Sequence, residues 1–188
     1  GDPLDPASEM GPVNSSKQFE RMQGFIAEAA AQGARLVTGG TRPSGTMFAQ
    51  GYWLEPTLYA DVTQEMRVVR EEIFGPVLTL YVYDDAQWAE TLHLINETSE
   101  YALTGAILSH DRYAIEQATR VLEGACGNLY INDKPTGAVV GQQPFGGARA
   151  SGTNDKAGSY LDLIRWVSPR TVKETLVSAT DYRYPCMD

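Results

Sequence analysis

The 188-residue chain has few residues of the kinds that build disulfide frameworks, metal centres or membrane spans. Its two cysteines, Cys126 and Cys186, stand far apart, which fits neither a disulfide framework nor a metal-ligand pattern. His93 and His110 show no metal spacing either, so we expect no metal site. No apolar run approaches the roughly 20 residues that cross a bilayer, and the first residues do not resemble a signal peptide. We therefore expect no membrane partner.

Basic residues are also scarce, because 15 lysines and arginines stand against 24 acidic residues, for a net charge of -9. Nucleic acids and anionic membranes favour clustered positive charge, so neither is an expected partner. A small anionic substrate is not excluded, since one pocket can be locally positive or lined by amides. Hydrophobic residues make up 43% of the chain, enough for a core, which disfavours disorder. Free thiols favour a reducing compartment, for which we expect the cytoplasm, with the mitochondrial matrix as the alternative.

Helical patterns follow three capping signals. Apolar residues at helical spacing after Asn14 or Ser15 predict a helix that ends at Gly33. Asp84 and Asp111 precede the next two apolar-periodic segments and predict the starts of two further helices.

Extended patterns alternate with these helices. Segments rich in β-branched and aromatic residues predict strands at 77–83, 103–108 and 129–131, and Pro56 argues against a central strand near it. Strand and helix alternating through short connections predict an α/β fold with a parallel sheet. Thr171 to Leu176 alternates weakly, which is typical of an exposed edge strand.

A glycine-rich run from Val139 to Lys156 is the most informative stretch of the chain. Its glycines and Pro144 predict a loop rather than a helix or a central strand. Because the run also carries Phe145 and Arg149, it differs from a flexible Gly/Ser spacer. A long loop of this kind usually lies over a ligand or against another backbone.

This run and the segment Gly127 to Lys134 just before it closely resemble the aldehyde dehydrogenase superfamily. Within that superfamily they are similar to the 1-pyrroline-5-carboxylate (glutamate semialdehyde) dehydrogenases. A second motif, Glu71 to Val77 (EEIFGPV), is similar to the segment that contacts the nicotinamide in these enzymes. The resemblance extends from about Gly1 to Lys173. It implies an NAD-dependent oxidation of glutamate semialdehyde to glutamate in proline catabolism.

In the second motif, Gly75 and Pro76 force a turn that leaves Glu72 and Phe74 at the entrance of a strand. The resemblance implies that Glu72 binds the nicotinamide ribose and that Phe74 positions the nicotinamide ring. A carboxylate can accept hydrogen bonds from ribose hydroxyls, and an aromatic ring can pack on the nicotinamide face. The alternative is a charged strand cap beside a core phenylalanine.

The resemblance also implies a substrate site. The backbone amides of Gly137 and Ala138 would anchor the substrate carboxylate, and Phe145 would line the tunnel for its aliphatic part. Some relatives carry Ser where this chain has Ala138; backbone recognition survives that change, whereas a hydroxyl contact would be lost. In the alternative, Gly137 only turns the chain and Phe145 fills the core. We expect Arg149 to stabilise the loop, by binding Asp155 or a carbonyl, rather than to bind the substrate.

No catalytic residue is assigned to these 188 residues. The nucleophilic cysteine and the general-base glutamate of the superfamily have no counterpart in the sequence, nor has its nucleotide-binding half, so we expect the chain alone to be inactive. Cys126 sits at a helix-to-strand junction among small residues, where a cysteine behaves as a small hydrophobe. Trp88 and Trp166 are expected to be packing anchors.

The resemblance implies a parallel three-layer arrangement with two parts. Residues 1–150 would be the C-terminal portion of the catalytic domain, and residues 151–188 a loop and oligomerisation arm that adds a strand to a neighbouring subunit of a homo-oligomer. A different class of function is left open, in which the chain is a non-catalytic carboxylate-binding or oligomerisation module derived from an aldehyde dehydrogenase.

Overall fold

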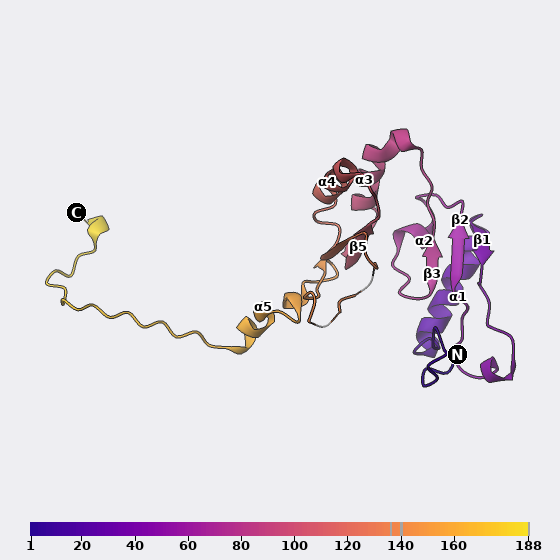
Figure 1. Cartoon of the computed structure of the whole chain (residues 1–188), viewed down its shortest axis with the longest axis horizontal. Coiled ribbons are helices and arrows are strands. Elements are labelled where there is room, and N and C mark those ends of the chain that lie inside the picture. The colour runs from indigo at the N-terminus through magenta and orange to yellow at the C-terminus, as the bar shows by residue number, and fades with distance from the viewer. Residues whose placement is uncertain (136, 140, 188) are drawn as a thin grey trace.

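Helices and short strands alternate along the chain in the computed structural model, which describes residues 1–135, 137–139 and 141–187. They gather in two lobes, and the C-terminal residues run away from both (Figure 1). The helices are α1 (Ser16–Ala31), α2 (Arg67–Arg70), α3 (Trp88–Glu97), α4 (Arg112–Val121) and α5 (Tyr160–Leu163). The strands are β1 (Arg35–Thr38), β2 (Thr57–Ala60), β3 (Val77–Thr79), β4 (Tyr101–Ala102), β5 (Thr104–Ile107), β6 (Asn128–Ile131) and β7 (Ala148–Arg149). Single 3-10 turns are η1 (Thr46–Phe48), η2 (Asp85–Gln87), η3 (Asn154–Lys156), η4 (Ile164–Trp166) and η5 (Pro185–Met187).

Helix α1 confirms the first capping prediction. The Ser15 hydroxyl accepts a hydrogen bond from the Gln18 amide, which satisfies one of the free N–H groups at the helix start. The helix ends before Gly33, whose φ of 89° is the left-handed conformation that glycine adopts without strain. Met22 and Phe25 on one face of the helix are buried in the core of the first lobe.

The first lobe contains a three-stranded sheet in the order β1-β2-β3. Strands β1 and β2 are antiparallel, whereas β2 and β3 are parallel. The segment before Pro56 forms no strand, in agreement with the argument against a central strand there, but the middle strand β2 begins directly after the proline, at Thr57. Proline lacks an N–H but is tolerated at the start of a strand, and the Thr57 amide donates to the Pro76 carbonyl at 2.8 Å.

The second lobe is built on the parallel pair β5 and β6, with Thr104 opposite Asn128 and Ile107 opposite Ile131. Both predicted acidic caps are confirmed. Asp84 makes a capping box at η2, which leads directly into α3, and the Asp111 carboxylate accepts hydrogen bonds from two amides of the first turn of α4. Helices α3 and α4 lie beside each other above the strands in Figure 1.

The predicted α/β class with parallel strands is confirmed, but the strands do not form one sheet. Within the described residues they make a three-stranded sheet and two strand pairs, β5-β6 and β4-β7. The strand predicted at 77–83 stops at Thr79, and Val82 is 77% exposed. Since the outer edge of β3 has no neighbouring strand among the described residues, nothing extends the ladder there.

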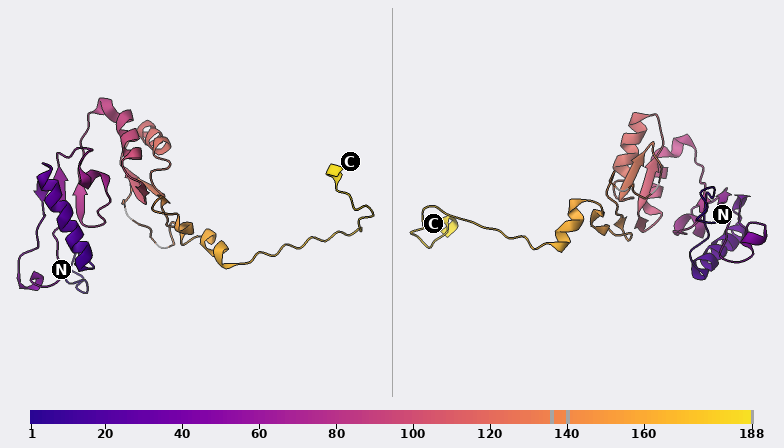
Figure 2. Two further views of the ribbon diagram at one scale, coloured as in Figure 1. Left: turned by 180° about the vertical axis from the view of Figure 1, so that it is seen from behind. Right: turned by 60° about the horizontal axis from the view of Figure 1, so that its bottom comes forward.

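The C-terminal segment from residue 167 to 184 is extended and exposed, as Figure 2 shows from two further directions. The expected strand at Thr171 to Leu176 is not formed within the described chain, because no other strand lies beside it to accept its hydrogen bonds. Trp166 is 82% exposed, so its prediction as a packing anchor was wrong for this chain. Pairing of the arm with another subunit, and the division at residue 150, stay predictions. Among the described residues, no helix is long and apolar enough to span a bilayer.

Candidate functional site

A cavity of about 720 Å³ lies between the two lobes. The loop that follows α2 forms one wall and carries Glu72 and Phe74. The opposite wall consists of β4, the start of β5 and Pro135, which is two residues before Gly137. Both expected cofactor residues therefore face one cavity, whereas Gly137 lies just outside its lining.

The backbone of the loop that follows α2 is held by side chains from α1. The Gln18 amide nitrogen donates to the carbonyl oxygens of Ile73, at 3.1 Å, and Phe74, at 3.0 Å. The Arg21 guanidinium donates to the carbonyls of Ile73 and Glu72, the latter at 2.6 Å. The sequence analysis missed Gln18 and Arg21. Their spacing of one helical turn on α1 can be read from the sequence, but the distant carbonyl groups that they bind cannot.

Phe74 does not belong to the core. Its φ is 58°, a left-handed conformation that costs a non-glycine residue energy, and 70% of the residue is exposed. The next residue, Gly75, lies close to α1: a Cβ there would be 2.1 Å from the Cε of Met22, so the end of that side chain would have to move. The close packing of Gly75 on α1 and the left-handed Phe74 together present the aromatic ring outward. The alternative of a core phenylalanine is therefore wrong for this chain.

The expected substrate residues lie together in the second lobe. A Cβ added at Gly137 would be 3.9 Å from the Phe145 ring, which is van der Waals distance. Neither the Gly137 amide nor the Ala138 amide donates a hydrogen bond to an acceptor within the described residues. The Gly137 carbonyl instead accepts a hydrogen bond from the hydroxyl of Tyr130 on β6. Two N–H groups that have no acceptor in the described part of the chain, beside a half-buried aromatic ring, can bind a carboxylate that carries an apolar chain.

The backbone on both sides of Phe145 is fixed by the side chain of Asn128, which sequence reasoning missed. Its amide nitrogen donates to the Pro144 carbonyl at 2.9 Å, and its oxygen accepts from the Gly146 amide at 3.2 Å. The Phe145 amide donates to the Ala157 carbonyl at 2.8 Å. Asn128 and Tyr130 stand two positions apart on β6, so they project from the same face of the strand.

Lys156 links the far end of the glycine loop to Gly127, the residue before β6. Its ammonium group donates to the carbonyl of Gly127 at 2.8 Å and to that of Gly146 at 2.6 Å. Lys156 has a φ of 53°, and the two residues before it are also left-handed. These contacts fix a strained backbone, which agrees with the prediction that the loop is not a flexible spacer.

Arg149 stabilises the loop through hydrogen bonds, as expected. Its guanidinium donates to the Asn96 carbonyl at 2.6 Å, to the Asn96 side-chain oxygen at 2.6 Å and to the Ser99 carbonyl at 3.3 Å. Of the two expected partner types, the carbonyl is therefore the one used. Asp155 pairs instead with Arg165, at 2.9 Å.

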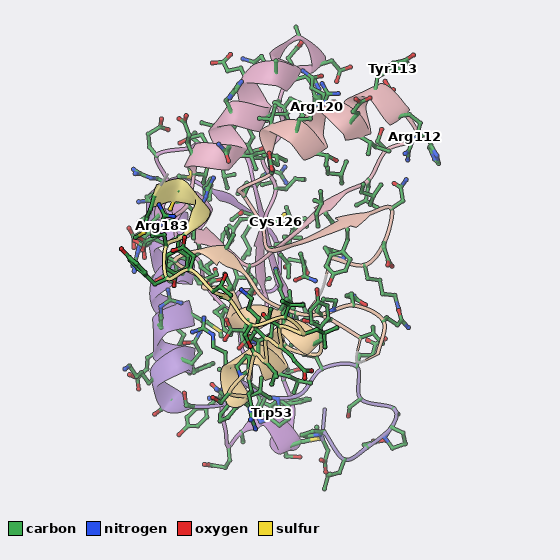
Figure 3. All side chains as sticks on the ribbon, turned by 90° about the vertical axis from the view of Figure 1, so that its left-hand side faces the viewer. Trp53, Arg112, Tyr113, Arg120, Cys126 and Arg183 are labelled. Carbon is green, nitrogen blue, oxygen red and sulfur yellow. The ribbon has the colours of Figure 1, made fainter. Side chains whose placement is uncertain are left out.

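Cys126 lies beside the strands of the second lobe (Figure 3). Its Sγ would be 3.2 Å from a Cβ placed on Gly105 of β5, so the thiol packs against the sheet backbone. Burial raises the pKa of the Cys126 thiol, although the nearby Lys156 ammonium acts in the opposite direction. Lys156 is far from Cys126 in the sequence and comes near it only through the fold. Because burial dominates, Cys126 lacks the lowered pKa of a reactive thiol.

The remaining residues considered in the sequence take no part in a site. His93 and His110 are exposed, and the part of the chain that the structure describes holds no cluster of potential metal ligands. Trp88 is anchored as expected: its indole N–H donates to the Gln117 side-chain oxygen at 2.9 Å, and its ring stacks on Tyr83.

The geometry of the two motifs agrees with comparisons of the chain with known proteins. The model of the aldehyde dehydrogenase family matches residues 1–172. The chain belongs to this family. Two expectations, the family and the fold class, are thereby confirmed.

Comparisons with individual proteins show which members of the family the chain resembles. The chain is 51% identical to the mitochondrial delta-1-pyrroline-5-carboxylate dehydrogenase of Dictyostelium discoideum, over 97% of the chain and 32% of that protein. A solved delta-pyrroline-5-carboxylate dehydrogenase from Mycobacterium tuberculosis, bound with NAD and cobalamin, is 45% identical with a TM-score of 0.75, over 95% of the chain and 32% of that protein. Betaine aldehyde dehydrogenase of Staphylococcus aureus is 32% identical with a TM-score of 0.75, over 96% of the chain and 34% of that protein.

The chain thus spans about a third of the length of the relatives that it matches. The printed name of the Dictyostelium relative places that protein in mitochondria, which agrees with the matrix alternative and gives no support to the cytoplasm.

Proposed function

We propose that this chain is part of a longer NAD-dependent dehydrogenase that oxidises glutamate semialdehyde, the open form of 1-pyrroline-5-carboxylate, to glutamate in proline catabolism. The observation that carries the proposal is the pair of amides at Gly137 and Ala138, which have no acceptor among the described residues and lie beside the Phe145 ring. The likeness to two pyrroline-5-carboxylate dehydrogenases supports the choice of substrate, and their mitochondrial member supports a mitochondrial matrix location.

The substrate has two ends, and these residues bind the one that does not react. The amides of Gly137 and Ala138 donate to its carboxylate, and Phe145 packs against its methylene groups. Backbone donors suit an acidic protein, because they bind an anion without a nearby formal positive charge. Asn128 and Lys156 keep the loop in place, so the bound aldehyde is held in one orientation.

The exposed Phe74 ring and the Glu72 side chain on the cavity wall fit a nicotinamide nucleotide. The Glu72 carboxylate would accept hydrogen bonds from the nicotinamide ribose, and the Phe74 ring would pack on the nicotinamide. NAD supplies the hydride acceptor of the oxidation when bound. Gln18 and Arg21 act on this site only through the backbone that they hold.

The 188 residues supply binding groups and no nucleophile in this proposal. Cys126 is packed against β5 with a raised pKa, so it is poorly suited to attack an aldehyde at neutral pH. The chain by itself is therefore expected to produce no NADH.

The test is a Gly137→Val variant of the whole dehydrogenase. The added branched side chain meets Phe145 and covers the amides, so the inhibition constant of glutarate, a product-like dicarboxylate, should rise about tenfold or more. Gly24→Ala on α1 is the matched control, because a Cβ there meets no atom within 4 Å. An unchanged glutarate constant in Gly137→Val would reject this carboxylate site.

The exposed tail favours a second role, in assembly. Leu176 is 94% exposed and Val177 is 80% exposed, and an extended apolar segment of this kind can add a strand to another subunit. In the dehydrogenase this would be an oligomerisation arm over residues 151–188. In a non-catalytic module derived from the family, it would be the main function, and a discrete dimer formed by the isolated chain would favour that module.

A further inference from the structure

Tyr130 is a buried residue whose hydroxyl reaches the proposed carboxylate site. It lies on β6, is 8% exposed, and donates a hydrogen bond to the carbonyl oxygen of Gly137. The same hydroxyl oxygen accepts a hydrogen bond from the side-chain amide of Gln143, at 3.2 Å. Tyr130 therefore links β6 to both the anchor turn and the glycine loop.

The geometry of one peptide group gives this contact its importance. The Gly137 carbonyl and the Ala138 N–H belong to the same planar peptide unit, and the described chain has no cis peptide bonds. In a trans peptide the C=O and the N–H point in opposite directions. A carbonyl fixed toward Tyr130 therefore directs the Ala138 N–H away from the Tyr130 hydroxyl.

Gln143 determines which way the tyrosine proton points. A phenolic hydroxyl can donate once and also accept. Because the Gln143 amide occupies an acceptor position on the oxygen, the proton is left for the Gly137 carbonyl. A carbonyl that accepts a hydrogen bond also polarises its own peptide group, which makes the Ala138 N–H a better donor.

We propose that Tyr130 is a positioning residue that aims the Ala138 amide at the substrate carboxylate, and that Gln143 orients the Tyr130 hydroxyl for this purpose. The inference rests on the proposed function, since it concerns the recognition of the same carboxylate. It predicts that selectivity for carboxylate-bearing aldehydes depends on one hydroxyl group that touches neither substrate nor cofactor.

The test is Tyr130→Phe in the whole dehydrogenase, which removes the hydroxyl and keeps the buried ring. The loss of one hydrogen bond that orients the donor should raise the KM for glutamate semialdehyde and the inhibition constant of glutarate about five- to tenfold. The kcat for glutamate semialdehyde, and both constants for propanal, which has no carboxylate, should stay within about twofold of the wild type. Gln143→Met should move the same two constants in the same direction by a smaller factor.

Tyr113→Phe is the matched control. Tyr113 is 85% exposed and points away from α4 in Figure 3, so all constants should keep their wild-type values. Equal losses with both aldehydes in Tyr130→Phe would show a merely structural role and overturn the inference, as would unchanged constants. A wild-type enzyme without preference for glutamate semialdehyde over propanal would overturn the proposed function itself, and with it the role of Tyr130. A wild type with that preference and an insensitive Tyr130→Phe variant would overturn the inference alone.

Discussion

At the residue scale, Phe74 combines an unfavourable backbone with an exposed aromatic ring. A left-handed φ of 58° costs a phenylalanine on the order of 1 kcal/mol, and exposure of its ring brings no compensating burial. The strained conformation is held in place because Gln18 and Arg21 of α1 donate hydrogen bonds to the carbonyls of residues 72–74. Strain kept in place by neighbouring contacts is typical of a binding position rather than of a structural one.

Phe74→Ala should therefore separate binding from stability. Loss of an exposed ring should change the free energy of unfolding by less than about 0.5 kcal/mol. The KM for NAD in the whole dehydrogenase should rise roughly fivefold, because the ring no longer packs on the nicotinamide. Tyr113→Ala removes a ring that is 85% exposed on α4, away from this loop, and should change neither quantity. Urea unfolding measures the free energy of unfolding, and steady-state kinetics measure the KM for NAD. An unchanged KM for NAD would show that Phe74 does not contact the cofactor.

The two cysteines provide an internal comparison of reactivity. Burial raises the pKa of Cys126, so less of it is thiolate at a given pH, whereas Cys186 lies in the exposed tail. With iodoacetamide at pH 8, Cys126 should be alkylated at least about tenfold more slowly than Cys186, and its rate should still be rising above that pH. Peptide mass spectrometry over time measures both rates. Faster alkylation of Cys126 would contradict its assignment as a packed, non-catalytic thiol.

At the element scale, α1 holds the loop that follows α2 through side chains on one face of the helix. Gln18 contacts two carbonyls of that loop and its amide can be removed with little change in volume by Gln18→Met. The loop would then lose two hydrogen bonds, and the KM for NAD should rise about threefold to tenfold while the KM for glutamate semialdehyde stays constant. Lys17→Met, an exposed neighbour, is the control. Equal effects on the two substrates would argue against a specific link between α1 and the cofactor site.

The elements show what the sequence could and could not predict. Local signals sufficed for the ends of α1 and for the Asp84 and Asp111 caps, since a cap is an interaction between residues close in sequence. The parallel pairing of β5 with β6 also follows from the strand-helix-strand pattern. The strand at 77–83 was predicted too long, because its length depends on a neighbour that propensity cannot reveal.

Of the candidate site, only the residues within the two motifs could be predicted from the sequence. Resemblance predicts roles for Glu72, Phe74, Gly137, Ala138 and Phe145, which stay predictions, and the structure shows which of these residues lie near one another. Their supporting groups are the long-range partners Gln18, Arg21, Tyr130 and Lys156, together with Asn128, whose contacts cross many residues of sequence. A single sequence holds no signal for such contacts.

At the scale of the whole molecule, the chain has two lobes with a cavity between them and an exposed arm (Figure 1). Apolar residues are exposed on the arm and also on β3, where Leu78 is 65% exposed. Surfaces of this kind in a member of an enzyme family favour contact with further protein.

Removal of the arm tests its proposed role. Ending the whole dehydrogenase before Thr171 should lower the sedimentation mass of the oligomer, because the segment that adds a strand to the neighbouring subunit is absent. Replacement of Leu176 and Val177 by serine keeps the full length of the chain and should also weaken the association between subunits. Each variant should keep the α-helical signal of its far-UV circular dichroism spectrum, since residues 167–184 form no helix in the described chain. An unchanged oligomer in both variants would exclude the arm from assembly.

The central claim is that these residues bind the carboxylate end of glutamate semialdehyde and provide no nucleophile of their own. The most direct measurement is NADH absorbance after 1-pyrroline-5-carboxylate and NAD are added, in parallel, to the whole dehydrogenase and to the 188-residue chain. Steady NADH formation is predicted for the whole dehydrogenase and none for the chain. Sustained turnover by the chain, or none by the whole dehydrogenase with this substrate, would contradict the claim.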